Sequence, residues 1–126
     1  MMAPSDWRVI VVEDTFDDLQ VMMTIFEHYG IPVWGVQSCD ECHTLLDEIQ
    51  PTVVITDLAM PNADGWEVLR QVREHPSLGH VPVVAMTSYH SDKLAQDVER
   101  GGFDGYFPKP VDPSQVIGFL SDILQA

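Results

Sequence analysis

Four short apolar runs recur along the chain, and most of them are rich in valine and isoleucine. They are Val9 to Val12, Val33 to Val36, Val53 to Thr56 and Val83 to Met86, with a weaker fifth run at Tyr106-Phe107. Because the runs are nearly continuous instead of alternating with polar residues, they are typical of strands buried on both faces of a parallel sheet. Parallel strands need long crossover connections, which are usually helices. The pattern therefore restricts the chain to folds in which strands and helices alternate.

Helical patterns fill the segments between these runs. We expect helices at Asp17 to Tyr29, from Ser38 to Ile49, at Gly65 to Glu74, at Asp92 to Arg100 and from Asp112 to Leu124. Ser38 and Asp112 have side chains that suit N-caps, and Pro113 suits a first helical position. Five strands alternating with five helices predict an α/β fold, an open doubly wound (βα)5 sheet with helices on both faces.

Length, composition and charge limit the kinds of partner that the chain can have. A length of 126 residues suits a single domain, residues 1–126, with a core at about 7–124. The chain has 6 Lys and Arg against 20 Asp and Glu, and the resulting net charge of −14 repels nucleic acid. No apolar run approaches the roughly 18 to 20 residues of a membrane span, and the N-terminus has no signal-peptide pattern. We therefore expect a cytoplasmic protein that binds neither nucleic acid nor membranes.

Polar side chains follow the expected strands at the points where the strands end. Glu13 and Asp14 follow the first run, Asp57 the third and Thr87 the fourth, while Lys109 follows the fifth. Right-handed crossovers bring these ends to one edge of a parallel sheet. Three neighbouring carboxylates repel one another unless a cation lies among them, and oxygen ligands open to water suit Mg²⁺. Beside a metal and a lysine, Asp57 could attack phosphorus in line and form an aspartyl phosphate.

Four motifs give the chain a resemblance to a known family. They are Glu13-Asp14, the segment from Asp57 to Gly65 (Asp-Leu-Ala-Met-Pro-Asn-Ala-Asp-Gly), Thr87-Ser88, and the segment from Gly101 to Pro110. In this order the chain resembles the receiver domains of bacterial two-component response regulators, of the stand-alone chemotaxis-regulator type, from about Trp7 to Leu124. The resemblance implies a flavodoxin-like sandwich with the parallel strand order 2-1-3-4-5.

The resemblance also implies roles for the residues at the strand ends. Asp57 would be the phosphoacceptor, taking its phosphoryl group from the phosphohistidine of a kinase. Asp14 and Asp57, with the backbone carbonyl of Ala59, would bind Mg²⁺, and Glu13 would help through water. Lys109 would pair with the phosphoryl group.

A second set of implied roles concerns the conformational switch. Thr87 would turn toward the phosphoryl oxygens and Tyr106 would follow it inward, while the Lys109-Pro110 bond is a candidate cis peptide. Two residues depart from the family pattern. Pro108 removes a backbone donor from the last strand, which an edge strand tolerates, and Phe103 replaces a residue that is commonly a small alanine. The segment before the last strand must therefore accommodate a larger ring.

The function expected from the resemblance is that of a signalling switch. It would phosphorylate and dephosphorylate itself without turning over a small-molecule substrate, so it is not an enzyme in the usual sense. Since the chain ends directly after its last helix, we expect a protein partner to read the signal on the face formed by residues 92–124, or the phosphoryl group to pass to another histidine. The sensor kinase or phosphotransfer protein, the effector, and whether phosphorylation drives dimerisation stay open.

The cysteines suggest an alternative function. Cys39-Asp-Glu-Cys42-His43 matches a haem-attachment string and also the placement of a thiol redox pair after a strand. Haem attachment requires export, and the two acids between the cysteines oppose a thiolate. The simpler interpretation places Cys42 in the core and Cys39 half exposed, and a redox protein stays the alternative function.

Three other site types fit the sequence less well. Zinc binding by Cys39, Cys42, His75 and His80 would need a far shorter gap between the two pairs. A phosphatase with a nucleophilic aspartate needs a second carboxylate two residues later, where this chain has Ala59. A flavodoxin needs a loop rich in Ser, Thr and Gly after the first strand, and the acidic loop here would repel a phosphate.

Overall fold

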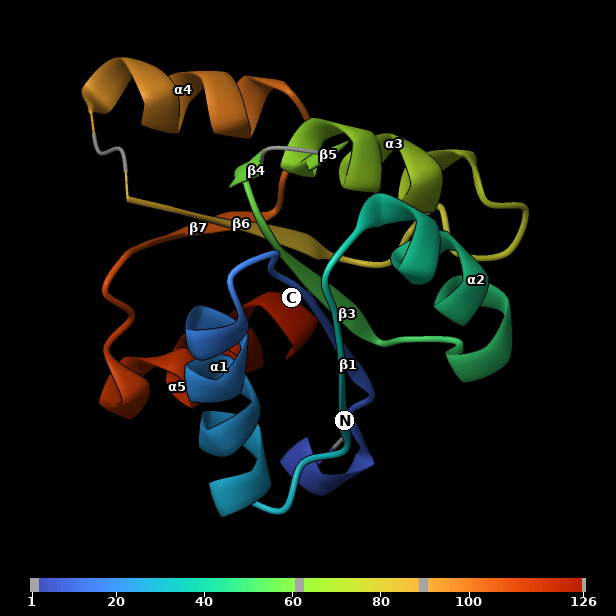
Figure 1. Cartoon of the computed structure of the whole chain (residues 1–126), viewed down its shortest axis with the longest axis vertical. Helices are drawn as coiled ribbons and strands as arrows, with labels where there is room; N and C mark the ends of the chain where they lie inside the picture. The colour runs from blue at the N-terminus through green and yellow to red at the C-terminus, as the bar shows by residue number, and fades with distance from the viewer. Residues whose placement is uncertain (1–2, 61–62, 89–90, 126) are drawn as a thin grey trace.

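Five parallel strands form one sheet at the centre of the molecule (Figure 1). The computed structural model describes residues 3–60, 63–88 and 91–125. The strands are β1 (Val9–Val12), β2 (Val33–Val36), β3 (Val53–Asp57), β6 (Val83–Thr87) and β7 (Gly105–Pro108). They lie in the order β2-β1-β3-β6-β7. This arrangement confirms the α/β fold and the predicted strand order 2-1-3-4-5.

Helices cover both faces of the sheet (Figure 1). They are α1 (Phe16–His28), α2 (Cys39–Ile49), α3 (Gly65–Glu74), α4 (Asp92–Arg100) and α5 (Pro113–Gln125). Helices α1 and α5 pack on one face, and α2, α3 and α4 lie on the other. Within the described residues, no helix has both the length and the apolar character needed to cross a bilayer.

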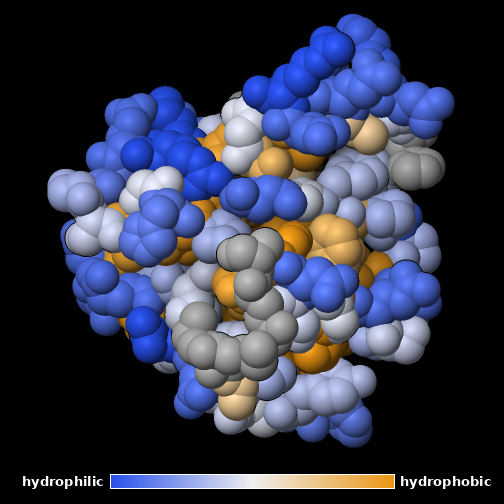
Figure 2. Space-filling model, turned by 180° about the vertical axis from the view of Figure 1, so that it is seen from behind, coloured by the Kyte–Doolittle hydropathy of each residue, from blue (hydrophilic) through white to orange (hydrophobic). Residues whose placement is uncertain are grey.

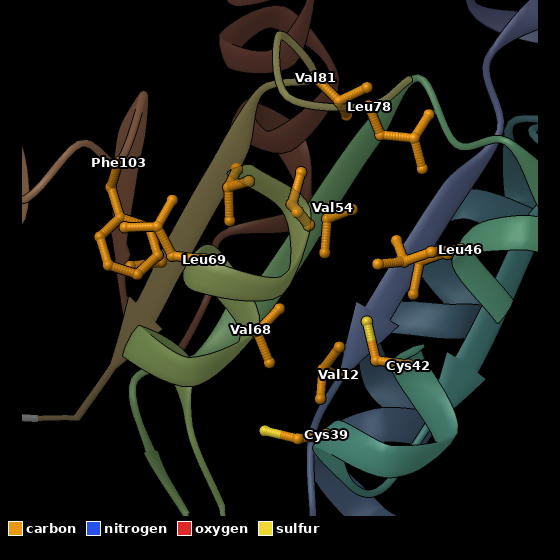
Figure 3. Packing of buried hydrophobic residues seen from close by; sticks show 14 of the residues in the cluster. Val12, Cys39, Cys42, Leu46, Val54, Val68, Leu69, Leu78, Val81 and Phe103 are labelled. Carbon is orange, nitrogen blue, oxygen red and sulfur yellow. The ribbon is translucent and has the colours of Figure 1, made fainter. Parts of the chain in front are cut away.

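Alternation along the strands divides the core into two apolar layers. Val11 and Ile55 face α1 and α5, whereas Val12 and Val54 face the opposite layer, and all four side chains are fully buried. Figure 3 shows Val12 and Val54 in that second layer, beside Leu46 of α2. Since both faces are covered, the strands are apolar along most of their length, as the sequence predicted.

The helix caps follow the predicted chemistry. Ser38 accepts a hydrogen bond from the Glu41 backbone N–H at 3.2 Å, and the Asp112 carboxylate accepts one from the Ser114 backbone N–H at 3.0 Å. Each cap satisfies a backbone donor that has no partner within its helix.

Some elements differ from the sequence prediction. A short 3-10 helix, η1 (Pro4–Asp6), and a two-stranded antiparallel pair, β4 (Ala59–Met60) with β5 (Ala63–Asp64), were not predicted. Helix α1 begins and ends one residue earlier than expected. Strands β3 and β6 each include one more polar residue at their carboxyl end, because Asp57 and Thr87 continue the ladder opposite Met86 and Pro108. Ladder pairing here extends beyond the apolar run that marked each strand.

Candidate functional site

The carboxyl ends of the central strands bring an acidic cluster together. Glu13 and Asp14 follow β1, and Asp57 is the last residue of β3. One carboxylate oxygen from each of the three lies within 4.8 Å of the other two. Main-chain bonds hold the cluster in place, because the Glu13 N–H donates to Val36 of β2 at 3.0 Å and the Leu58 N–H donates to Met86 of β6 at 2.8 Å.

Lys109 places its ammonium group among these carboxylates. Its Nζ donates to Glu13 Oε2 at 2.6 Å and to Asp57 Oδ2 at 2.8 Å, and a third contact reaches Asp18 Oδ2 at 3.3 Å. The Lys109 backbone N–H donates to the Thr87 carbonyl at 2.9 Å, which resumes the β6 pairing directly after Pro108. The structure thus brings together five of the predicted residues, Glu13, Asp14, Asp57, Thr87 and Lys109, and it adds Asp18.

Burial and charge set the ionisation of this cluster. Burial first, and then the neighbouring Asp57, raise the pKa of Glu13 to about 7, against the opposing effect of the hydrogen bond from Lys109. Burial alone would lower the pKa of Lys109, but its hydrogen bonds to Asp57 and Glu13 outweigh this and raise it above its ordinary value. Lys109 therefore stays charged, while Glu13 lacks full compensation for its buried charge.

The family of the chain follows from comparison with known proteins. The family model of the response regulator receiver domain matches residues 9–121. The chain belongs to this family. Its acidic cluster and its lysine lie at the carboxyl ends of the strands, where the sequence motifs predicted them. The resemblance to receiver domains is therefore confirmed.

Relatives of this receiver cover almost its whole length. It is 34% identical to a 14.6 kDa protein of Leptolyngbya boryana over 93% of this chain and 89% of that protein. It is 31% identical to the two-component response regulator ORR12 of Oryza sativa over 82% of this chain and 87% of the relative. It is also 25% identical to the polar-differentiation response regulator DivK of Brucella ovis, over 92% and 94%.

Solved structures share the fold of this receiver. The chemotaxis response regulator CheY4 of Vibrio cholerae matches with a TM-score of 0.84 and 22% identity, over 93% of this chain and 98% of that chain. A response regulator of Desulfuromonas acetoxidans matches with a TM-score of 0.85 and 19% identity, over 94% and 97%. These likenesses agree with the sheet order described above.

The acidic cluster fits a magnesium ion. Its three carboxylates supply hard oxygen donors at short range, and Asp14 is only partly buried, which suits a metal that keeps bound water. Ala59 begins β4 two residues after Asp57, and its carbonyl stays a predicted ligand. Among the described residues, this is the only group of three or more acidic, histidine or cysteine side chains close enough to hold a metal.

Magnesium is expected to stabilise this receiver, because the ion relieves repulsion among native-state carboxylates. At ten times the dissociation constant, the free energy of unfolding should rise by about 1.4 kcal/mol. Thermal melts with and without millimolar Mg²⁺ measure the rise. Asp14→Ala should abolish it, whereas Asp17→Ala, in the nearby first turn of α1, should keep it. An undiminished rise in Asp14→Ala would place the metal elsewhere.

The raised pKa of Glu13 predicts a pH dependence in the absence of divalent metal. The folded state binds the Glu13 proton more tightly than the unfolded state does, since the carboxyl pKa is about 7 against an ordinary value of 4.5. This contribution to stability is complete below pH 4.5 and is lost as the pH rises through 7, by roughly 2 to 3 kcal/mol. Chemical denaturation at pH 5 and pH 7.5 should show this loss in the wild type and a smaller one in Glu13→Gln. Equal losses in the two proteins would refute the assignment.

Thr87 and Tyr106 lie on neighbouring strands beside the cluster. Thr87 ends β6 and is almost fully buried, and Tyr106 of β7 pairs with Ala85. Tyr106 packs against the apolar layer beneath α3 and α4, and burial raises the pKa of its hydroxyl. The placement of both residues fits the expected switch, but their roles stay predictions.

The structure accommodates Pro108 and Phe103, the two residues that depart from the family pattern. Pro108 is exposed on β7, an edge strand. Phe103 is buried and meets Trp66 edge to face, with ring centroids 5.1 Å apart. Gly101 makes room for this pair, since a Cβ there would collide with the Trp66 ring. The larger ring at position 103 thus links the start of α3 to the end of α4. The Lys109-Pro110 bond is cis, as the resemblance implied.

The structure does not support a redox function for the cysteines. Cys39 was expected to be half exposed, but it is buried at 6% exposure, because the first turn of α2 points it toward Val12 and Val68 (Figure 3). Burial, with a smaller contribution from the neighbouring Cys39, raises the pKa of the Cys42 thiol to about 12. A reactive thiol needs a lowered pKa and access to solvent, so both cysteines are core residues.

The zinc interpretation also fails, because His75 is engaged elsewhere. Its Nε2 lies 2.7 Å from Asp47 Oδ1, and its Nδ1 accepts a hydrogen bond from the Ser77 backbone N–H at 3.2 Å. This histidine links α2 to the loop after α3.

Proposed function

We propose that this receiver is a phosphorylation-driven switch in which Asp57 accepts a phosphoryl group from the phosphohistidine of a kinase or phosphotransfer protein. The observation that carries the proposal is the position of the Asp57 carboxylate. It is buried, it contacts Lys109 Nζ at 2.8 Å, and it lies close enough to Glu13 and Asp14 to share a metal ion with them. This combination of a nucleophile, a fixed cation and oxygen donors suits phosphoryl transfer.

In the proposed reaction, an Asp57 carboxylate oxygen attacks phosphorus. A new O–P bond forms while the P–N bond of the donor breaks, and its electron pair returns to the histidine. Lys109 turns an N–H from the carboxylates to a phosphoryl oxygen and holds its negative charge. Bound Mg²⁺ would supply further charge neutralisation, with Asp14, Asp57 and the Ala59 carbonyl as ligands and Glu13 acting through water. Water later hydrolyses the acyl phosphate and returns the carboxylate.

Small phosphodonors test this proposal without the natural kinase. Incubation with acetyl phosphate and Mg²⁺, followed by intact mass, should give one phosphate adduct on the wild type. Asp57→Asn should give none, whereas Asp104→Asn, a change of the same charge near the opposite end of the sheet, should keep the adduct. An adduct that persists in Asp57→Asn would exclude Asp57 as the acceptor.

The proposed output surface is the face formed by α4, β7 and α5. Helix α4 is held loosely, since Val98 is its only fully buried residue among those described. Figure 2 shows it as a hydrophilic projection from the body of the molecule. Thr87 precedes this helix and Tyr106 follows it. A phosphoryl group that draws Thr87 inward would leave room for the Tyr106 ring and shift the position of α4, which a protein effector then reads.

Hydrogen exchange should report this shift. With beryllofluoride and Mg²⁺ as a phosphoryl mimic, protection should change across residues 91–109 by roughly 1 to 3 kcal/mol of opening free energy, because α4 has little apolar anchorage. Thr87→Ala should remove most of the change at Tyr106 while the mimic still binds. If only α1 and α2 respond, the output surface is assigned wrongly.

A further inference from the structure

The ammonium group of Lys109 contacts three carboxylates, and one of them, Asp18, belongs to α1. Nζ contacts Glu13 at 2.6 Å, Asp57 at 2.8 Å and Asp18 at 3.3 Å. The Lys109 side chain is only 14% exposed. An ammonium has three N–H donors, so these contacts account for all of them.

Asp18 differs from the other two acids in its freedom to move. The Glu13 side chain is fully buried and that of Asp57 is 10% exposed, whereas the Asp18 side chain is 52% exposed. Asp18 also lines a cavity of about 130 Å³ beside Lys109 and Pro110. Within the described residues, Lys109 is the one cation that the buried Glu13 contacts, so Glu13 cannot leave it without burying an unpaired charge. The half-exposed Asp18 can instead rotate toward water at small cost.

An ordinary explanation exists for an acid at this place in a helix. Asp17 and Asp18 both lie in the first turn of α1, where a negative charge interacts favourably with the helix dipole. That explanation applies equally to the two residues. Only Asp18 reaches Lys109, because Asp17 has no ion pair within the part of the chain that the structure describes. Contact with the lysine therefore separates Asp18 from its neighbour.

We propose that Asp18 is a positioning residue that holds Lys109 in the unphosphorylated site and competes with the incoming phosphoryl group for its N–H. This inference rests on the proposed function. An incoming phosphoryl group carries about two negative charges and needs an N–H donor from Lys109. Asp18 accepts from that ammonium group and adds a further negative charge nearby. Asp18 therefore slows phosphorylation of Asp57 and must release the lysine for transfer to be complete.

The test compares Asp18→Asn with Asp17→Asn, which make the same change in net charge and in the helix dipole. Initial rates of phosphorylation are measured by intact mass over a range of acetyl phosphate concentrations with saturating Mg²⁺. Asp18→Asn should be faster than Asp17→Asn by roughly twofold to fivefold, the size expected for one half-exposed ion pair. Asp18→Glu should restore a rate closer to that of the wild type.

Ionic strength distinguishes contact from general repulsion of the anionic donor. Raising the salt to 0.5 M screens charges that act over a distance, so any gain in Asp17→Asn should disappear. The excess of Asp18→Asn over Asp17→Asn should remain, because it arises within the site. A second measurement avoids phosphoryl transfer, since the ammonium protons of ¹⁵N-labelled Lys109 should exchange with water faster in Asp18→Asn than in Asp17→Asn.

The outcomes separate this inference from the proposed function. If the wild type gains an adduct that Asp57→Asn lacks, but Asp18→Asn and Asp17→Asn phosphorylate at equal rates, the role of Asp18 is refuted and the function stands. A slower Asp18→Asn would also refute it. If the wild type gains no adduct at all, the proposed function itself fails.

Discussion

Gly65→Ala is expected to slow phosphorylation of Asp57 by roughly tenfold to a hundredfold, because even a displacement of about 1 Å in a site has effects of that size. A Cβ at this position would lie 2.6 Å from the Asp57 carbonyl oxygen and 2.9 Å from Leu58 Cα. Both neighbours are backbone atoms, so no side-chain rotation relieves the clash. The loop between β3 and α3 must move, and it carries Asp57 with it.

The same substitution should also lower the free energy of unfolding by roughly 1 to 3 kcal/mol, as overpacking does in other close-packed sites. Gly118→Ala in α5 is the matched control, since a Cβ there meets open space. It should raise stability by about 0.5 to 1 kcal/mol through its better helix propensity and leave phosphorylation unchanged. Acetyl phosphate rates and urea denaturation measure both effects. A Gly65→Ala protein that phosphorylates at the wild-type rate would mean that this loop does not position Asp57.

Two residues of β3 are expected to change stability in opposite directions when each is replaced by alanine. Ile55 is fully buried against α1 and α5, and Ile55→Ala should cost roughly 2 to 5 kcal/mol through lost burial and the cavity left behind. Asp57→Ala should instead stabilise the metal-free protein by about 1 kcal/mol, because removing one of three close carboxylates relieves like-charge repulsion at the buried Glu13. Lys109 loses one partner in this variant but still has Glu13, which it contacts at 2.6 Å in the wild type.

Urea denaturation without divalent metal shows whether Asp57→Ala raises or lowers the free energy of unfolding. Added Mg²⁺ should reduce or reverse the advantage of Asp57→Ala, since that variant lacks a proposed ligand. Strong destabilisation of Asp57→Ala in metal-free buffer would show that Asp57 has a structural role.

The sequence predicted most of the fold because its strands are mostly apolar and because clear capping residues mark the starts of α2 and α5. Val9 to Val12 alone indicates burial on both faces, and Ser38 marks the start of α2. The strand-end acids and Lys109 could be placed at one edge because parallel strands end together. Contacts that depend on the direction of a side chain could not be predicted from the sequence. Asp18 looks like any acid in a first helical turn, and only the structure shows that it reaches the lysine.

The burial of Cys39 illustrates the same limit. A residue at the first position of a helix is commonly exposed, and its sequence neighbours Asp40 and Glu41 are exposed here. Cys39 instead packs into the apolar layer that also contains Val12 and Val68, a tertiary contact that its local sequence does not show. The pairing of Trp66 with Phe103 likewise joins residues 37 positions apart, so no local pattern could reveal it.

Chemical trapping of the phosphorylated protein tests the central claim most directly. Borohydride reduces an acyl phosphate, but not a free carboxylate or a phosphate ester, so the modified aspartate becomes homoserine. Protein phosphorylated by acetyl phosphate and Mg²⁺, then reduced, digested and sequenced by mass spectrometry, should carry homoserine at position 57 alone. Homoserine at Asp14, or a phosphate that survives reduction on a hydroxyl side chain, would contradict the account.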